Sequence, residues 1–499
     1  MTLPRNPIIY EINTWVWLNA LSVHADQPIT LATVPDAILD ELVTWRFDAI
    51  WLMGVWQRSP QGREIARTQP GLQMEYARAL SDYTDADVVG SPYAVNRYEV
   101  DPALGGRDGL AAFRERLAAY NLKLILDYVP NHVAVDHPWT HECAACLVAG
   151  TEDDLKNRPG YYFRASAGDA DGSNSGLIFA HGRDPYYPGW TDTAQIDAFS
   201  ETARQHSRDT VLDIAAQCDG VRCDMAMLMV NRVFAKTWSL SDLPRAEFWE
   251  VIIPPIKAKY PDFAFMAEVY WDMEADLQTL GFDYTYDKRL YDRMRDDGAG
   301  SVRDHLLAAS GYQQKMVRFV ENHDEARALA AFGLERSQAA AALATLLPGA
   351  HLLHDGQFEG RRLKLPVQLG RRPIENPIEL LLTFYRALLS EAAQPPYHEG
   401  VYMALAANPL SGDSDDPAAL IAFAWALADD WRIVVVNFSG QSIQTRLIIP
   451  FPHLSGFTTW EFTDALSGTT ALHGGADVLT AGLPIALPAY GVQIWRIAQ

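Results

Sequence analysis

The sequence contains no long apolar run and no surplus of positive charge. No stretch approaches the roughly 18 consecutive apolar residues that suggest a membrane-spanning helix. Residues 1–5 lead into a strand-like segment rather than into the apolar region of a secretion signal. With 41 Lys and Arg against 63 Asp and Glu, the net charge of −22 repels nucleic-acid backbones and anionic lipids. These absences predict a soluble, unexported protein with no nucleic-acid or membrane partner.

Cysteine is scarce as well, with four residues in a chain of 499. That number is too small for a secreted disulfide framework. Cys143 and Cys146, with His137 and His141 nearby, imitate half of a zinc site, but no second CxxC or paired histidine follows at the required spacing. We therefore expect free thiols, a cytoplasmic location and no zinc.

Short apolar runs alternate with amphipathic stretches over most of the chain, as in a parallel sheet with helical connections. Apolar residues recur at helical spacing within 38–45 and 110–117. Eight strands joined by helices predict an α/β fold, the (β/α)8 barrel. The predicted strands are residues 8–12, 49–56, 122–129, 220–224, 263–269, 282–286, 316–321 and 351–354.

Two segments depart from this rhythm. Residues 134–190 are polar, rich in Gly and Asp at 167–175, and too long for a simple connection, which predicts a small subdomain inserted after strand 3. From about residue 401 the pattern changes to β-rich runs, which predict a C-terminal antiparallel β-sandwich. These runs are residues 420–425, 432–438, 444–449, 458–462 and 492–497. The predicted domains are a barrel (1–133 and 191–396), the inserted subdomain (134–190) and the C-terminal domain (397–499).

Ionisable side chains close four of the predicted strands. In a barrel of this kind, residues at the carboxyl ends of the strands line the active site. Buried carboxylates are costly unless cations or hydrogen-bond donors compensate them, and such groups are present at the same strand ends. The residues concerned are Asp127 near the end of strand 3 and His132 after it, Arg222 and Asp224 in strand 4, Glu268 in strand 5, and His323 and Asp324 after strand 7.

Two carboxylates and a third acid suit the cleavage of a glycosidic bond through a cation-like transition state. Asp224, kept ionised by Arg222, is expected to attack the anomeric carbon. Glu268, kept protonated by apolar neighbours such as Phe265 and Met266, is expected to protonate the leaving oxygen. Asp324 is expected to oppose the developing positive charge.

The order and strand positions of these residues resemble the four signature regions of the α-amylase family, glycoside hydrolase family 13. The resemblance spans most of the chain, because segments before strand 3 and at the end of strand 8 also match. The inserted subdomain and the C-terminal β domain fit the family as well. The matching segments are residues 127–132, 220–224, 268 and 322–324, together with 90–93, 101–102 and 354–357.

The resemblance implies a role for each matching residue. It implies that Asp224 is the nucleophile, Glu268 the general acid/base and Asp324 the transition-state stabiliser. It further implies that Arg222 orients the nucleophile, that His132 and His323 contact the sugar, that Tyr93 stacks on it, and that Asp127 is mainly a structural anchor.

The sequence also departs from the family at two places. Met227 and Leu228 stand where many α-amylases have Lys and His, so donors to the sugar hydroxyls are missing on the leaving-group side. This difference suggests an enzyme that acts on small oligosaccharides and transfers sugars between them. Gln195 stands at an acidic position of the family's calcium signature, and Asn131 alone is a poor ligand set for a hard cation. We therefore expect neither a metal nor another cofactor.

The leading hypothesis is a retaining enzyme that cleaves α-glucosidic bonds of α-glucans or oligosaccharides through a covalent glycosyl-enzyme. An α-glucan transglycosylase that uses the same intermediate is the alternative. A third hypothesis is a non-catalytic relative that binds carbohydrate or serves as a scaffold, but a scaffold has no need of Asp224, Glu268 and Asp324 together. Trp190, Tyr270 and Trp271, just beyond strand ends, are candidate stacking platforms for sugar rings.

Overall fold

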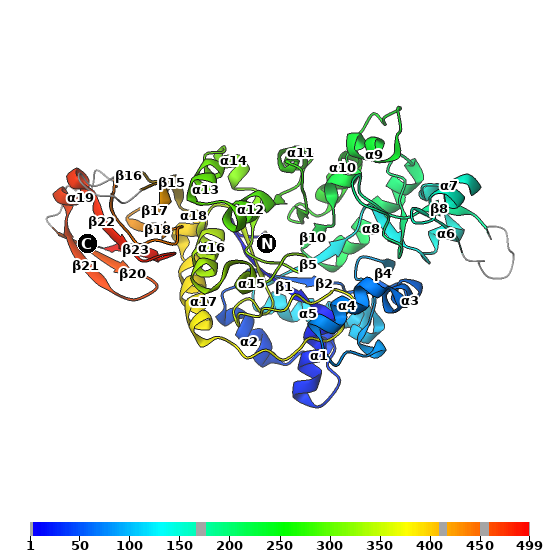
Figure 1. The fold of residues 1–499 in the computed structure, drawn as a ribbon, viewed down its shortest axis with the longest axis horizontal. Coiled ribbons are helices and arrows are strands. Elements are labelled where there is room, and N and C mark those ends of the chain that lie inside the picture. The colour runs from blue at the N-terminus through cyan, green and yellow to red at the C-terminus, as the bar shows by residue number, and fades with distance from the viewer. Residues whose placement is uncertain (1–2, 166–175, 409–416, 450–458, 499) are drawn as a thin grey trace.

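Eight parallel strands close into a barrel in the computed structural model, which describes residues 3–165, 176–408, 417–449 and 459–498 (Figure 1). Strands consecutive along the chain are neighbours in the barrel, and the last pairs with the first. The (β/α)8 prediction is confirmed. The strands are β1 (Ile8–Asn13), β2 (Ala49–Met53), β5 (Lys123–Tyr128), β10 (Gly220–Cys223), β11 (Ala264–Ala267), β12 (Tyr284–Tyr286), β13 (Met316–Arg318) and β14 (Ala350–His354).

The second strand ends earlier than the sequence pattern indicates. Gly54 has φ +76°, a left-handed conformation that breaks the extended backbone directly after β2. Trp56 belongs instead to β3 (Trp56–Arg58), which pairs antiparallel with β4 (Val95–Val100). This turn also places the Gly54 amide within hydrogen-bond distance of the Asp127 carboxylate.

Helices surround the barrel, and both helical patterns noted in the sequence form helices. Leu110, Phe113 and Leu117 are buried on one face of α5, which is the burial that their spacing predicts. None of the helices in the described residues is long and apolar enough to cross a bilayer. The larger ones are α1 (Thr14–Ala25), α2 (Asp36–Thr44), α5 (Gly106–Ala119), α8 (Glu201–Gln217), α10 (Phe248–Lys259), α12 (Lys288–Asp296), α16 (Leu334–Leu346) and α17 (Glu379–Ala392).

A separate unit leaves the barrel between β5 and β10, on the side opposite the C-terminus (Figure 1). It contains two short antiparallel pairs, and the first of these anchors it to the end of β5. The Gly- and Asp-rich residues 167–175 lie outside the described residues. The strands are β6 (His132–Ala134) with β9 (Thr193–Gln195), and β7 (Tyr162–Arg164) with β8 (Ile178–Ala180).

Cys143 and Cys146 in this unit form a disulfide, so the prediction that they are free thiols is wrong. The chain turns tightly between α6 (Trp139–Glu142) and a short 3-10 helix, and the Cys146 amide donates to the Cys143 carbonyl. The turn brings the two Cα atoms to 5.4 Å, within bridging range. Cys218 and Cys223 are free and buried.

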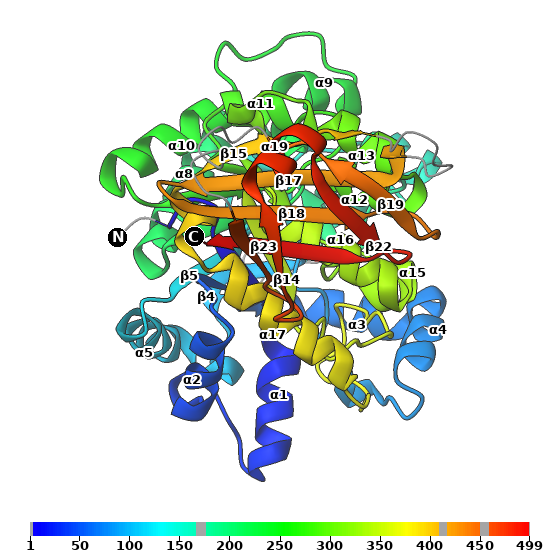
Figure 2. The same ribbon diagram turned by 90° about the vertical axis from the view of Figure 1, so that its left-hand side faces the viewer.

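The C-terminal segment forms two antiparallel sheets, as expected, and Figure 2 looks onto them. Apolar side chains of both sheets share one core. The domain is attached to the barrel's outer helices: Trp425 Nε1 donates to the Leu346 carbonyl at 2.8 Å, and Arg432 contacts the buried Glu391 of α17 at 2.7 Å. Thr458, the start of one predicted strand, lies outside the described residues. The larger sheet has the order β15 (Val401–Ala404), β17 (Leu420–Leu427), β18 (Asp430–Asn437), β23 (Val492–Ala498), β20 (Thr459–Asp464) and β21 (Thr470–Gly474), and the smaller one β16 (Ala407–Asn408), β19 (Ile443–Leu447) and β22 (Leu483–Leu487).

Candidate active site

One buried guanidinium group joins the two principal carboxylates. Arg222 lies in β10 and is 0% exposed. Its Nη1 donates to Asp224 Oδ1 at 2.8 Å, and its Nη2 donates to Glu268 Oε2 at 2.6 Å. Because β10 and β11 are hydrogen-bonded neighbours, Asp224 and Glu268 follow directly adjacent strand ends. Two carboxylates on neighbouring nitrogens of one guanidinium lie close together.

Aromatic rings and a third carboxylate enclose Arg222. The centroids of the Trp51 and Tyr93 rings lie 5.3 Å and 5.2 Å from its central carbon, and Asp127 Oδ1 lies 3.6 Å from Nη1. The Gly54 amide donates to the other Asp127 oxygen at 3.0 Å. Burial raises the pKa of Asp127 to about 6, against the lowering effect of Arg222. Asp127 thus contacts the same guanidinium nitrogen as Asp224, whereas Glu268 contacts the other one.

The surroundings of Glu268 differ from the apolar environment that its sequence neighbours indicate. Its Oε2 accepts from Arg222 and from the Met225 amide at 2.8 Å, and its Oε1 accepts from the Tyr270 hydroxyl at 2.7 Å. Phe265 instead packs against Phe282, with ring centroids 6.2 Å apart. Neighbours along a strand point to opposite faces, so they do not describe the space beyond the strand end.

The ionisation of Asp224 also differs from expectation. Burial raises its pKa to about 8; Arg222 opposes this shift, and the negative charges of Glu268 and Asp324 add to it. Arg222 contacts both Asp224 and Glu268, so its charge does not act on Asp224 alone. The Asp224 carboxyl therefore retains its proton to a higher pH than an exposed aspartate does.

Glu11, which the sequence reading missed, completes a second charged group beside the first. This fully buried residue of β1 has its Oε1 2.5 Å from His323 Nδ1. On the other side of the ring, His323 Nε2 lies 2.8 Å from Asp324 Oδ2. Burial opposes a charge on His323, but Asp324 and Glu11 outweigh it and raise the pKa of His323 to about 10. The charged imidazole in turn lowers the pKa of Asp324 against the effect of burial.

Tyr93 connects the two groups. Its hydroxyl lies 2.6 Å from His323 Nε2, and its ring faces the Arg222 guanidinium. The His132 side chain is hydrogen-bonded to the Tyr93 backbone. Burial lowers the pKa of His132 to about 4, so this imidazole is neutral at pH 7. The ring of Trp190 lies 5.1 Å from that of His132. The structure thus brings all eight predicted site residues into one connected region at the barrel mouth.

The remaining sequence candidates fall in different places. Tyr270 acts through its hydroxyl on Glu268 rather than as an exposed platform. Trp271 is 37% exposed and meets Tyr186 of the inserted unit edge to face, with centroids 5.1 Å apart. Met227 and Leu228 are buried in the main core, so their side chains do not line an open leaving-group site.

The position that the resemblance associates with calcium holds a hydrogen-bonded amide. Gln195 is 0% exposed, and its Nε2 donates to Asn131 O at 2.8 Å, Asn131 Oδ1 at 3.0 Å and Ile196 O at 3.1 Å. Oxygens of this kind are the ligands that a hard cation requires. Because the Gln195 amide already donates to these oxygens and neither Gln195 nor Asn131 is a carboxylate, these residues do not fit calcium.

We therefore expect a chelator to leave activity and melting temperature unchanged, because a ligand that is not bound contributes no stability. Thermal unfolding and turnover with and without EDTA measure this. A Gln195→Asp variant is the positive control: its new carboxylate is expected to lower the melting temperature, with recovery when calcium is added. A chelator-induced loss in the unmodified protein that calcium reverses would contradict the assignment.

A closed (β/α)8 barrel with a buried carboxylate pair and a third acid at its mouth defines an enzyme of the glycoside hydrolase type. Residues 38–362 match the family model for the α-amylase catalytic domain. The chain belongs to the α-amylase family, as its strand-end residues indicate.

Individual relatives agree with this assignment. The chain is 26% identical to the α-amylase MalA of Haloarcula japonica over 416 residues, which cover 81% of this chain and 52% of the relative. It is 21% identical to α-amylase 3 of Dictyoglomus thermophilum over 294 residues, or 56% and 55% of the two chains. The chain thus spans about half the length of the curated relatives it matches.

Solved structures share the fold. The maltogenic α-amylase AmyB of Thermotoga neapolitana has a TM-score of 0.67 and 18% identity, with both chains covered in full. The α-amylase of Geobacillus thermoleovorans, solved with acarbose, has a TM-score of 0.67 and 16% identity, covering 100% of this chain and 99% of that one. At these identities the likeness extends to the fold alone.

Proposed function

We propose that the protein is a retaining glycosidase acting on α-glucosidic bonds of α-glucans or oligosaccharides. The observation that carries the proposal is the single guanidinium that binds Asp224 and Glu268 together. Retaining enzymes hold their two carboxyl groups about 5–5.5 Å apart, whereas inverting enzymes need about 6.5–9.5 Å to admit a water molecule. A shared arginine favours the short separation. Relatives named α-amylases support the substrate class.

In the first step, Asp224 attacks the anomeric carbon while Glu268 protonates the departing oxygen, so a carbon–oxygen bond to the enzyme forms as the glycosidic bond breaks. In the second step, Glu268 removes a proton from water, which displaces Asp224 and leaves an α-configured product. Asp324, held ionised by His323, opposes the positive charge of both transition states.

The remaining groups position these three. Arg222 holds both reacting carboxyls, and Asp127 contacts Nη1 of Arg222. Tyr93 and His132 border the space where the reacting sugar would bind. The Tyr270 hydroxyl and the Met225 amide hold the two Glu268 oxygens in fixed directions. Fixed donors of this kind lower the reorganisation needed during reaction.

The stereochemical outcome tests the proposal. Proton NMR of maltoheptaose cleavage, recorded before mutarotation, is expected to show the α-anomer first. A first-formed β-anomer would contradict a double displacement. The same reactions at high substrate concentration test transfer, because products longer than the substrate would show that a sugar intercepts the intermediate. The burial of Met227 and Leu228 removes the sequence-based reason to favour transfer.

A pH profile follows from the raised pKa of Asp224. Asp224 must be ionised to attack the anomeric carbon, and its pKa of about 8 delays that ionisation. As pH rises from 5, kcat/KM is therefore expected to increase until about pH 8. Initial rates on maltoheptaose from pH 5 to 10, with a stability check at each pH, measure this. A kcat/KM that is already maximal at pH 6 would contradict the shift.

A further inference from the structure

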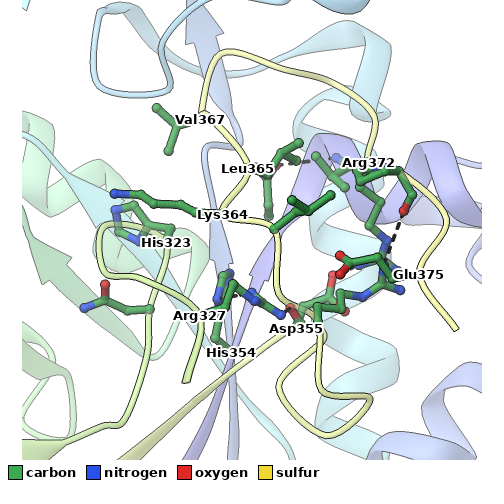
Figure 3. Close-up of a pocket in the computed structure, with 15 residues that line it drawn as sticks. His323, Arg327, His354, Asp355, Lys364, Leu365, Val367, Arg372 and Glu375 are labelled. Carbon is green, nitrogen blue, oxygen red and sulfur yellow. Dashed lines mark hydrogen bonds and ion pairs between the residues drawn. The ribbon is translucent and has the colours of Figure 1, made fainter. Parts of the chain in front are cut away.

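A small cavity adjoins the catalytic cluster on the side of Asp324. Its walls are the ends of β13 and β14, including His323 and Asp355, and the segment 361–375 that follows β14 and folds back over the barrel mouth (Figure 3). The cavity volume is about 40 Å³, which is room for a few water molecules. The mechanism proposed above does not use this space.

Four cationic side chains line the cavity: Arg327, Arg361, Lys364 and Arg372. Two have carboxylate partners, because Arg327 lies 3.1 Å from Glu321 and Arg372 contacts Asp355. For Arg361 and Lys364, the described part of the chain provides no carboxylate at ion-pair distance. Lys364 reaches toward His323, where its ammonium donates to the Asp324 carbonyl (Figure 3).

The positive groups are packed closely and incompletely hydrogen-bonded. The Nε atoms of Arg361 and of the 5%-exposed Arg327 are buried without a hydrogen-bond partner. Gly356, at φ +91°, makes room for both side chains, since a Cβ there would collide with each. Burial, followed by the charge of Arg372, lowers the pKa of Arg361. Glu375 also lines the wall, and its carboxylate accepts from the Arg362 amide.

We infer that this arginine pocket, formed by Arg327, Arg361, Lys364 and Arg372, binds a phosphate group. The planar, multidentate guanidinium matches phosphate oxygens, and an anion would satisfy donors that are otherwise buried without partners. The small cavity volume of about 40 Å³ suits a compact anion such as phosphate. Because His323 lines both spaces, a phosphate here would sit next to the bound sugar. The inference that the natural substrate is a phosphorylated saccharide rests on the proposed function.

A binding measurement on an inactive variant tests this inference without requiring catalysis. Calorimetric titration of the Asp224→Asn protein with glucose 6-phosphate, glucose and inorganic phosphate, at constant ionic strength, requires no turnover. Glucose 6-phosphate is expected to bind about ten- to a hundredfold more tightly than glucose, the gain expected for charge-assisted hydrogen bonds. Inorganic phosphate binding as tightly as glucose 6-phosphate would support the pocket but assign it to free phosphate.

Variants identify the pocket. In the Asp224→Asn background, Arg361→Gln is expected to remove the gain in affinity for glucose 6-phosphate over glucose. If Arg361→Gln fails to fold, Lys364→Gln, which alters an exposed side chain, is expected to remove the same gain. Arg362→Gln, an exposed neighbour outside the cavity, is expected to retain it. Equal affinity for glucose and glucose 6-phosphate with no binding of phosphate, or a gain that survives both pocket variants, would overturn the inference. Failure of the NMR test above would overturn the proposed mechanism but not this binding result.

Discussion

Replacing Asp224 with asparagine, or Glu268 with glutamine, is expected to lower kcat by roughly 10⁴–10⁶-fold while the fold persists, the loss seen when a nucleophile or proton donor is removed from an active site. The amide oxygens of both variants can still accept from Arg222. Because burial raises the pKa of Asp224 above that of the unfolded chain, this carboxyl costs stability at pH 7, so its neutral isostere is not expected to lower the melting temperature. Turnover of maltoheptaose and thermal unfolding measure the two expectations.

The leaving group distinguishes the two roles. An α-glucosyl fluoride needs little protonation of its leaving group, so it should restore the first step in Glu268→Gln but not in Asp224→Asn. Asp213→Asn, which alters an exposed acid paired with Arg107, is the matched control and should retain full activity. Near-normal hydrolysis by Asp224→Asn, or equal rescue of both variants, would refute the assignment.

The strand ends were the most predictable part of the site. An apolar run that ends in an ionisable residue indicates both the strand and which of its ends lies at the barrel mouth. For this reason Asp224, Glu268 and Asp324 could be predicted from the sequence, and they lie together in the structure. The inserted unit was predicted from the polarity and length of residues 134–190, and the C-terminal sheets from a change to β-rich runs. These signals are local, so one sequence suffices to reveal them.

What the sequence did not show depends on groups that converge from distant elements. Arg222 was assigned to Asp224 alone because the two are near in sequence, whereas its second nitrogen reaches Glu268 on the next strand. Glu11 had a signal that went unused: an acid within the apolar strand 8–12 requires a buried cation, which His323 provides from 312 positions away. The cavity beneath 361–375 depends on the path of a long loop, which periodicity does not describe.

The largest expected effect on stability is that of Arg222→Gln. This change leaves Asp224, Glu268 and Asp127 buried without their shared cation, and breaking a buried ion pair from one side costs about 3–5 kcal/mol. Arg107→Gln, which removes an exposed ion pair with Asp213, should cost less than about 1 kcal/mol. Denaturant unfolding of both variants at pH 7 measures the two losses in the free energy of unfolding. Comparable losses would show that the buried ion pairs of Arg222 contribute no more to stability than an exposed ion pair does.

The pH dependence of that loss shows its cause. Arg222 lowers the pKa of both Asp127 and Asp224, so its removal raises these pKa values further in the folded protein. A folded state that binds more protons than the unfolded chain becomes relatively more stable as pH falls. The deficit of Arg222→Gln relative to the unmodified protein should therefore shrink between pH 8 and pH 5. A deficit independent of pH would point to lost packing against Trp51 and Tyr93 rather than to uncompensated charge.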